Sequence, residues 1–151
     1  MAEHHFYLKA HWPHSSKDAG NISAGNLVTQ ISIPTEMNGP GIGTNPDEML
    51  LGAASTCYII TLAVMLEYKK IEKINLTMES EGIVEVSAGG TPTYKKIIHR
   101  PTILLKPDAT DEDIATVHKL AEKAEGSCMI SRALKGNVEI TAEVNVNRAT
   151  N

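Results

Sequence analysis

Residues 43–68 read GTNPDEMLLGAASTCYIITLAVMLEY and carry the strongest helix signal in the chain. Asn45 is a good helix cap, Pro46 suits the first helical position, and the two acids after it complement the positive end of the helix dipole. From Met49 to about Tyr68 the side chains are small or apolar on nearly every face. A helix without a polar face has to be covered on all sides. The segment therefore predicts a central helix that is wrapped by sheet or shared between two subunits.

Strand patterns flank this helix on both sides. Residues 4–12 have β-forming content and residues 27–33 alternate apolar and polar side chains, with a turn-rich stretch between them, so they predict an opening hairpin. After the helix, residues 74–86 and 94–106 predict two strands joined through a glycine turn. Pro101 has no N–H for a sheet ladder, which predicts a bulge or an edge position there.

The last third of the chain predicts two helices and a strand. The segment that begins at Thr110 opens with acids and keeps an apolar helical spacing until Gly126, where we expect it to end. Ser127 is then expected to cap a short helix over 128–134, and residues 138–146 alternate as a final strand. Strands and helices in this order predict the α+β class.

The composition is that of a globular protein, with 42% apolar and 21% charged residues. The formal net charge is -4 and no basic run exceeds two residues, so nucleic acid is not an expected partner. The first five residues lack the apolar core of a signal peptide, and the longest apolar run, 58–66, is about half of a membrane span. We expect a cytoplasmic chain with one domain, residues 1–151, and no membrane contact.

The chain has two cysteines, Cys57 in the long helix and Cys128 at the start of the short one. In the cytoplasm such cysteines serve catalysis or metal binding, or are inert, more often than they form a permanent bridge. A buried cysteine such as Cys57 usually packs as a small apolar residue. Cys128 is expected to face the N–H groups of a helix start, which favour a thiolate. A dithiol–disulfide cycle is one of several uses that remain open at this point.

Metal binding and hydrolysis are the competing uses of these thiols. No Cys-x-x-Cys pair occurs, and the six histidines have no spacing typical of a zinc site, so we predict neither a metal nor a cofactor. A Cys–His hydrolase needs His99 or His118 beside Cys57, and this alternative stays open.

Residues 43–57, GTNPDEMLLGAASTC, resemble a signature in which a Gly-Thr-Asn-Pro-acid start precedes the peroxidatic cysteine, that of the family of osmotically inducible protein C and the organic hydroperoxide resistance proteins. Residues 127–137, SCMISRALKGN, are similar to its second signature, in which Cys-x-x-Ser opens a short helix before a last strand. The two motifs occur in the family's order, and the plan of elements covers nearly the whole chain.

The resemblance implies an intertwined homodimer in which antiparallel sheets wrap around the long cysteine-bearing helices. It also implies reduction of organic hydroperoxides, with Cys57 as the reacting thiol and Cys128 as its resolving partner. A dithiol reductant, for which relatives commonly use a lipoyl-type dithiol, would reopen the disulfide.

The chain departs from the family pattern at one position. Relatives supply an arginine from the first hairpin, held by a glutamate at the start of the helix, whereas no arginine precedes Arg100 here. Lys17 is our candidate replacement, although an ammonium lacks the planar fork of a guanidinium. Asp47 stands in the glutamate's place, with Glu48 beside it as the alternative. Asp47 precedes Cys57 by ten positions, about 15 Å along a helix, so a bridging cation or a second subunit has to connect them.

Further candidates follow from position. Arg132 lies four residues after Cys128, on the same helical face, where it either lowers the pKa of that thiol or is solvated. The expected apolar walls of a peroxide pocket are Met49, Leu50, Tyr58, Ile60, Met65 and Met129. Two other functions remain as alternatives: an OsmC-like protein that binds an apolar or thiol-bearing ligand with little turnover, and a structural dimer with inert thiols.

Overall fold

The computed structural model describes residues 1–151, which form two compact units, Met1–Met49 and Leu50–Asn151. Helix α1 (Pro46–Tyr68) begins in the first unit and continues through the second. The expectation of one domain over residues 1–151 stays a prediction.

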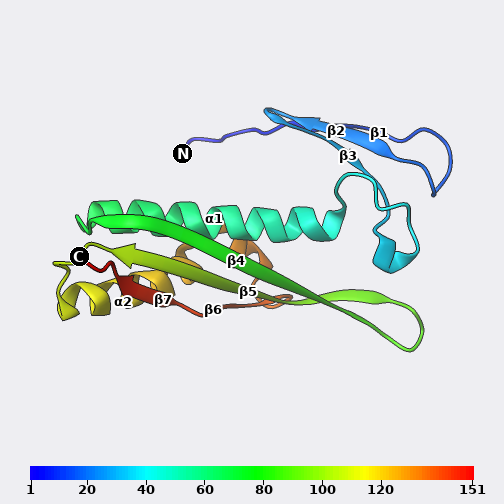
Figure 1. Cartoon of the computed structure of the whole chain (residues 1–151). Helices are drawn as coiled ribbons and strands as arrows, with labels where there is room; N and C mark the ends of the chain where they lie inside the picture. The colour runs from blue at the N-terminus through cyan, green and yellow to red at the C-terminus, as the bar shows by residue number, and fades with distance from the viewer. The chain divides into compact units, whose positions relative to one another are not determined.

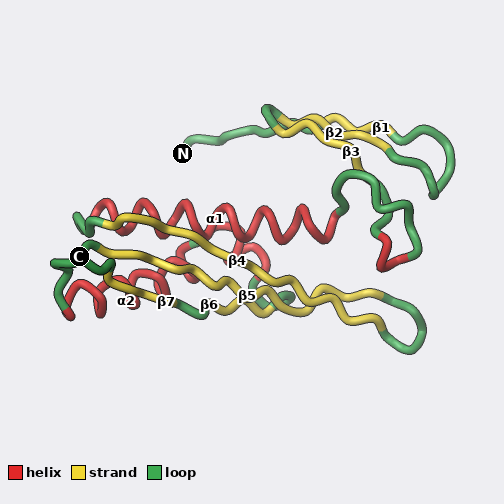
Figure 2. Tube along the Cα trace, viewed as in Figure 1, coloured by secondary structure: helices red, strands yellow, loops and turns green.

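The first unit contains a three-stranded antiparallel sheet made of β1 (Lys9–His11), β2 (Gly20–Ala24) and β3 (Leu27–Ile31), in that order (Figure 2). The predicted hairpin between 4–12 and 27–33 is therefore wrong, because β2 lies between the two strands. Gly20 and its polar neighbours look like a turn in sequence. A Cβ at Gly20 would lie 2.4 Å from the carbonyl oxygen of His11, so the glycine permits the close approach of β1.

A short 3-10 helix, η1 (Thr35–Met37), and a loop lead from this sheet to α1. The predicted cap of α1 is confirmed: Asn45 Oδ1 accepts a 2.9 Å hydrogen bond from the Glu48 backbone N–H, and Asn45 Nδ2 donates to Glu48 Oε1 at 2.9 Å. Pro46 is the first helical residue, where its missing N–H removes no helical bond.

The second unit is built on a long antiparallel ribbon of β4 (Lys73–Val86) and β5 (Pro92–Leu105) (Figure 1). β6 (Glu139–Ala142) and β7 (Asn145–Arg148) pair in parallel with the other side of β5. The single final strand predicted over 138–146 is thus two strands. The gap between them faces residues 100–101 of β5.

Pro101 lies at this gap and not at an edge, because β5 is the inner strand of its sheet. The register irregularities of the ribbon are elsewhere, between Lys73 and Asn75 and between Ile83 and Val84. The prediction of a bulge or an edge at Pro101 is therefore wrong. The sheet accommodates a residue without an N–H by interrupting the parallel ladder beside it.

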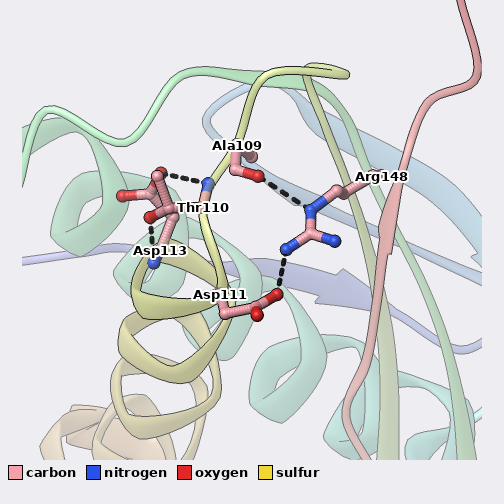
Figure 3. A network of polar contacts seen from close by, with 5 residues as sticks. All are labelled: Ala109, Thr110, Asp111, Asp113 and Arg148. Atoms are coloured by element: carbon pink, nitrogen blue, oxygen red, sulfur yellow. Dashed lines mark hydrogen bonds and ion pairs between the residues drawn. The ribbon is translucent and has the colours of Figure 1, made fainter.

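Helix α2 (Asp111–Ser127) begins where the sequence predicts it. Thr110 Oγ1 accepts a hydrogen bond from the Asp113 N–H at 3.0 Å, and Asp113 Oδ2 accepts one from the Thr110 N–H at 2.8 Å. Figure 3 shows this capping box beside Arg148, which pairs with Asp111 and donates from Nε to the Ala109 carbonyl at 2.7 Å. The contacts of Arg148 attach β7 to the start of α2.

Helix α3 (Met129–Leu134) follows after a single non-helical residue, Cys128. The predicted end of α2 at Gly126 and the predicted cap at Ser127 are both wrong, since α2 continues through these residues. A glycine costs a helix only about 1 kcal/mol and does not have to end it. Cys128 has φ −64° and ψ 124°, and its N–H donates to the Ala124 carbonyl at 3.0 Å, so it closes α2 and caps α3.

The main core of the second unit lies between the two long helices and β5. Its buried side chains come from one stripe of α1, one face of β5 and the inner face of α2: Tyr58, Leu62, Leu66, Ile103, Leu105, Val117, Leu120, Ala121 and Ala124. The α+β class is confirmed. The opposite face of α1 exposes Ile60, Val64 and Tyr68, at 62%, 59% and 84%. Sheet wrapping around all sides of α1 stays a prediction.

By length and composition alone, α1 is apolar enough to cross a membrane. The sequence estimate missed this because it counted only the uninterrupted run 58–66. Core helices of soluble proteins pass the same test, and the stripe Ala54, Tyr58, Leu62 and Leu66 is buried against the rest of the second unit.

Candidate dithiol site

The structure brings the two cysteines together. Cys57 lies half-buried near the middle of α1, Cys128 is fully buried at the junction of α2 and α3, and both are free thiols. Each side chain affects the pKa of the other, so the two thiols lie close together. Both residues belong to the second unit.

Cys57 is the more acidic of the two. Burial raises the pKa of the Cys57 thiol, but hydrogen bonds from the Cys128 side chain, the backbones of Ile130 and Met129, and the Thr61 side chain outweigh it, so the pKa is lowered from its ordinary value. Donors favour the anion because they stabilise the negative charge on sulfur. The groups that favour the Cys57 thiolate are therefore neutral donors and include no cation.

Cys128 is the less acidic partner. Burial and the hydrogen bond with Cys57 raise the pKa of Cys128 above its ordinary value, against the opposing effect of hydrogen bonds from Ser131 and Ile130. Its Sγ also caps α3 by accepting from the Ser131 N–H at 3.5 Å. The amides at the start of α3 lower the pKa of Cys128, as the sequence predicts, but burial and the hydrogen bond with Cys57 outweigh them, so the net effect is opposite to the expected thiolate.

Tyr58, the residue after Cys57, is fully buried in the core. Its hydroxyl donates to the Ala121 carbonyl at 2.7 Å, and its ring stacks on His99 with centroids 4.8 Å apart. The role of Tyr58 as a pocket wall stays a prediction. Burial lowers the pKa of His99 to about 4, so this ring is neutral at physiological pH.

The Cys–His pair of the hydrolase alternative is not formed. Neither His99 nor His118 is among the groups that hydrogen bond Cys57. Nor is any group of three or more His, Cys, Asp or Glu side chains arranged to hold a metal ion.

The remaining predicted residues lie in several elements. Lys17 is in the turn before β2, where its N–H donates to Ser15 Oγ at 3.2 Å. Asp47 and Glu48 are in the first turn of α1, and Glu48 bonds the capping Asn45. The roles of Lys17 and Asp47 toward the thiols stay predictions.

The predicted apolar walls differ in exposure. Met49 and Leu50 are half-buried in α1, Met65 packs against the core, and Ile60 is exposed. Met129 has an exposed side chain and reaches Cys57 through its backbone. The remaining predicted cation, Arg132, is exposed and does not shift the pKa of either thiol.

Thr61 and Ile130 are members of the site that the sequence reasoning missed. Thr61 follows Cys57 by one helical turn, and this spacing is a signal that was available in the sequence. Ile130 has no such signal, because its backbone reaches Cys57 only through the packing of α3 on α1.

These elements define an α+β protein with a paired dithiol, in which donors acidify one thiol and the second thiol is one of those donors. The sequence model of the family described as OsmC-like protein matches residues 39–143, and the chain belongs to this family. The family includes peroxidases. The resemblance noted in the sequence is confirmed.

Individual relatives agree with this assignment. The chain is 65% identical over 146 residues to the uncharacterized protein YmaD of Bacillus subtilis, covering 97% of each chain. It is 27% identical over 119 residues to organic hydroperoxide resistance protein-like 2 of Staphylococcus epidermidis, covering 78% of this chain and 80% of the relative. The crystal structure of an organic hydroperoxide resistance protein OsmC from Legionella pneumophila superposes with a TM-score of 0.75 at 22% identity, covering 96% of this chain and 99% of the other. The last comparison confirms the fold.

Proposed function

We propose that this protein is a thiol peroxidase that reduces organic hydroperoxides to alcohols. The observation that carries the proposal is the pairing of Cys57, whose pKa is lowered, with the buried thiol of Cys128. A peroxidatic cysteine has to be a thiolate at neutral pH, and a resolving cysteine has to lie close enough to form a disulfide.

The proposed reaction has three steps. The Cys57 thiolate attacks the distal oxygen of the hydroperoxide; the O–O bond breaks, and the leaving alkoxide takes a proton to become the alcohol, which leaves Cys57 as a sulfenic acid. The Cys128 sulfur then attacks the Cys57 sulfur, forming a Cys57–Cys128 disulfide and releasing water. A dithiol, of lipoyl type in our proposal, supplies two electrons and two protons to restore both thiols.

The other residues of the site have the following roles in this proposal. Neutral donors from Thr61, Met129 and Ile130 stabilise the thiolate. Lys17 would provide the cation for the peroxide, held by Asp47 or, alternatively, by Glu48. Met49, Leu50, Tyr58 and Met129 would form an apolar wall, which favours bulky organic peroxides over hydrogen peroxide.

We further propose an intertwined cytoplasmic homodimer. Ile60, Val64 and Tyr68 form an exposed apolar stripe on α1. A helix face of this kind is stable in water only when another surface covers it. A second copy of the chain, as in other members of the family, is the occupant we propose.

A second candidate function is the binding of an apolar or thiol-bearing ligand with little turnover. It is favoured by the lack of any arginine before Arg100 and by the complete burial of Cys128, which restricts access for a reductant. This candidate predicts ligand binding at Cys57 without fast consumption of peroxide.

Stopped-flow oxidation of the reduced protein by cumene hydroperoxide and by hydrogen peroxide separates the two functions. We expect fast loss of two thiols, faster with the organic peroxide, and a Cys57–Cys128 crosslink in the mass spectrum. Cys128→Ser should stop at a sulfenic acid that dimedone traps, Cys57→Ser should not react, and Lys17→Met should slow the first step. Slow reaction with both peroxides would reject the peroxidase in favour of ligand binding.

A further inference from the structure

Tyr58 makes a hydrogen bond between the two helices that lead to the thiols. It follows Cys57 directly in α1, and its buried hydroxyl donates to the Ala121 carbonyl of α2 at 2.7 Å. Burial, followed by the nearby carboxylates of Glu125 and Glu122, raises the pKa of Tyr58. The phenol therefore keeps its proton and remains a donor throughout the physiological pH range.

The ring of Tyr58 is held from the sheet side as well. His99 of β5 stacks on it with an interplanar angle of 25°, and His99 Nδ1 is 2.8 Å from Ser80 Oγ of β4. A buried aromatic ring with a bonded hydroxyl and a stacked neighbour has little freedom to move. Four elements, α1, α2, β4 and β5, thus determine the position of the residue next to Cys57.

The acceptor of this bond is rigidly connected to the second thiol. Ala121 lies within α2, which continues without interruption to Ser127, and the Cys128 N–H donates to the Ala124 carbonyl at 3.0 Å. Cys57 is thus connected to Cys128 in two ways: through Tyr58, its hydrogen bond to Ala121 and helix α2, and through the interaction of the two sulfurs.

We propose that Tyr58 is a positioning residue that holds the Cys57 and Cys128 sulfurs at the separation from which a disulfide forms. Its hydroxyl fixes α1 against α2, so that little chain freedom is lost when the sulfurs join. This proposal rests on the proposed function, because the step that the Tyr58 hydrogen bond accelerates is the attack of the Cys128 sulfur on the Cys57 sulfenic acid. The same positioning of the two sulfurs favours formation of the Cys57–Cys128 disulfide by any oxidant.

Tyr58→Phe removes the hydroxyl and keeps the ring. We expect the effective concentration of the two thiols, measured by equilibration of the whole protein with oxidised and reduced glutathione, to fall about fivefold, as for the loss of one net hydrogen bond. In that equilibrium one oxidised glutathione takes two electrons from the dithiol and becomes two reduced molecules. With cumene hydroperoxide, the lifetime of the sulfenic acid should lengthen by a similar factor. Ser80→Ala, which frees the stacked His99, should shift both quantities in the same direction by less.

Thr110→Ala is the matched control, since it removes the capping hydrogen bond of α2 far along the helix from Cys128. It should lower the melting temperature about as much as Tyr58→Phe does and leave the glutathione equilibrium unchanged. An unchanged equilibrium in Tyr58→Phe, or equal shifts in Tyr58→Phe and Thr110→Ala, would overturn the positioning role. If the wild type equilibrates with glutathione but does not react with peroxide, the proposed function fails while the test of Tyr58 stands.

Discussion

Acidification is expected to destabilise this protein through one residue, His99. Its side chain is fully buried, and burial alone lowers the pKa of His99 from 6.5 to about 4. Only Nδ1 has a partner, Ser80 Oγ, while Nε2 has none. The surroundings of the buried ring therefore provide only one hydrogen-bond partner, and the second N–H of a protonated His99 would have no acceptor.

The size of the effect follows from proton linkage. Because the pKa is lower in the folded state, the unfolded chain binds the proton first as the pH falls. The contribution of His99 to the free energy of unfolding is thus complete above pH 6.5 and decreases between pH 6.5 and about 4. Below that range it changes no further. At about 1.4 kcal/mol per pH unit, the whole window contributes about 3 kcal/mol, of which about 2.5 kcal/mol is lost by pH 4.5.

The assay is urea unfolding of the reduced protein at pH 7.5, 5.5 and 4.5. The comparison is with a double variant, Ser80→Ala with His99→Phe, which keeps a ring against Tyr58 and leaves no hydroxyl without its partner. All other histidines and carboxylates are present in both proteins, so the difference between the two profiles isolates His99. Between pH 7.5 and 5.5 the wild type should lose about 1.3 kcal/mol more than the variant. Parallel profiles would show that His99 does not stay neutral through burial, and would refute the reasoning.

Two other substitutions test the site and the assembly. Thr61→Val should raise the pKa of Cys57, because it removes one of the hydrogen bonds that stabilise the thiolate, as measured by the pH dependence of iodoacetamide alkylation. Thr56→Val, whose hydroxyl bonds only backbone carbonyls of α1, is the control, and equal pKa values in both variants would exclude a role of Thr61. Ile60→Glu places a charge in the exposed stripe of α1 and should convert the dimer to a monomer, as measured by light scattering. Lys123→Glu, on the exposed face of α2, is the control and should leave the dimer intact. A dimer that persists in Ile60→Glu would place the interface elsewhere.

Local signals in the sequence predicted the long elements well. The starts of α1 and α2 are predicted correctly, because the cap at Asn45, the proline at Pro46 and the capping box at Thr110 each depend on residues within one helical turn of one another. Where pairing partners lie far apart in the chain, the same reasoning failed. β2 looked like a turn because its glycine and polar residues are typical of one, and only pairing with β1 and β3 makes it a strand.

By itself the sequence determined the α+β class, the bounds of the cysteine helix and, through two motifs, membership of the OsmC-like family. Only the tertiary structure decided which thiol is the acidic one. The donors that lower the pKa of Cys57 come largely from Cys128, Met129 and Ile130, which lie about half the chain away and reach it through the packing of α3 on α1. A pKa depends on burial and on hydrogen-bond donors in space, and neither quantity is encoded in the residues next to the thiol.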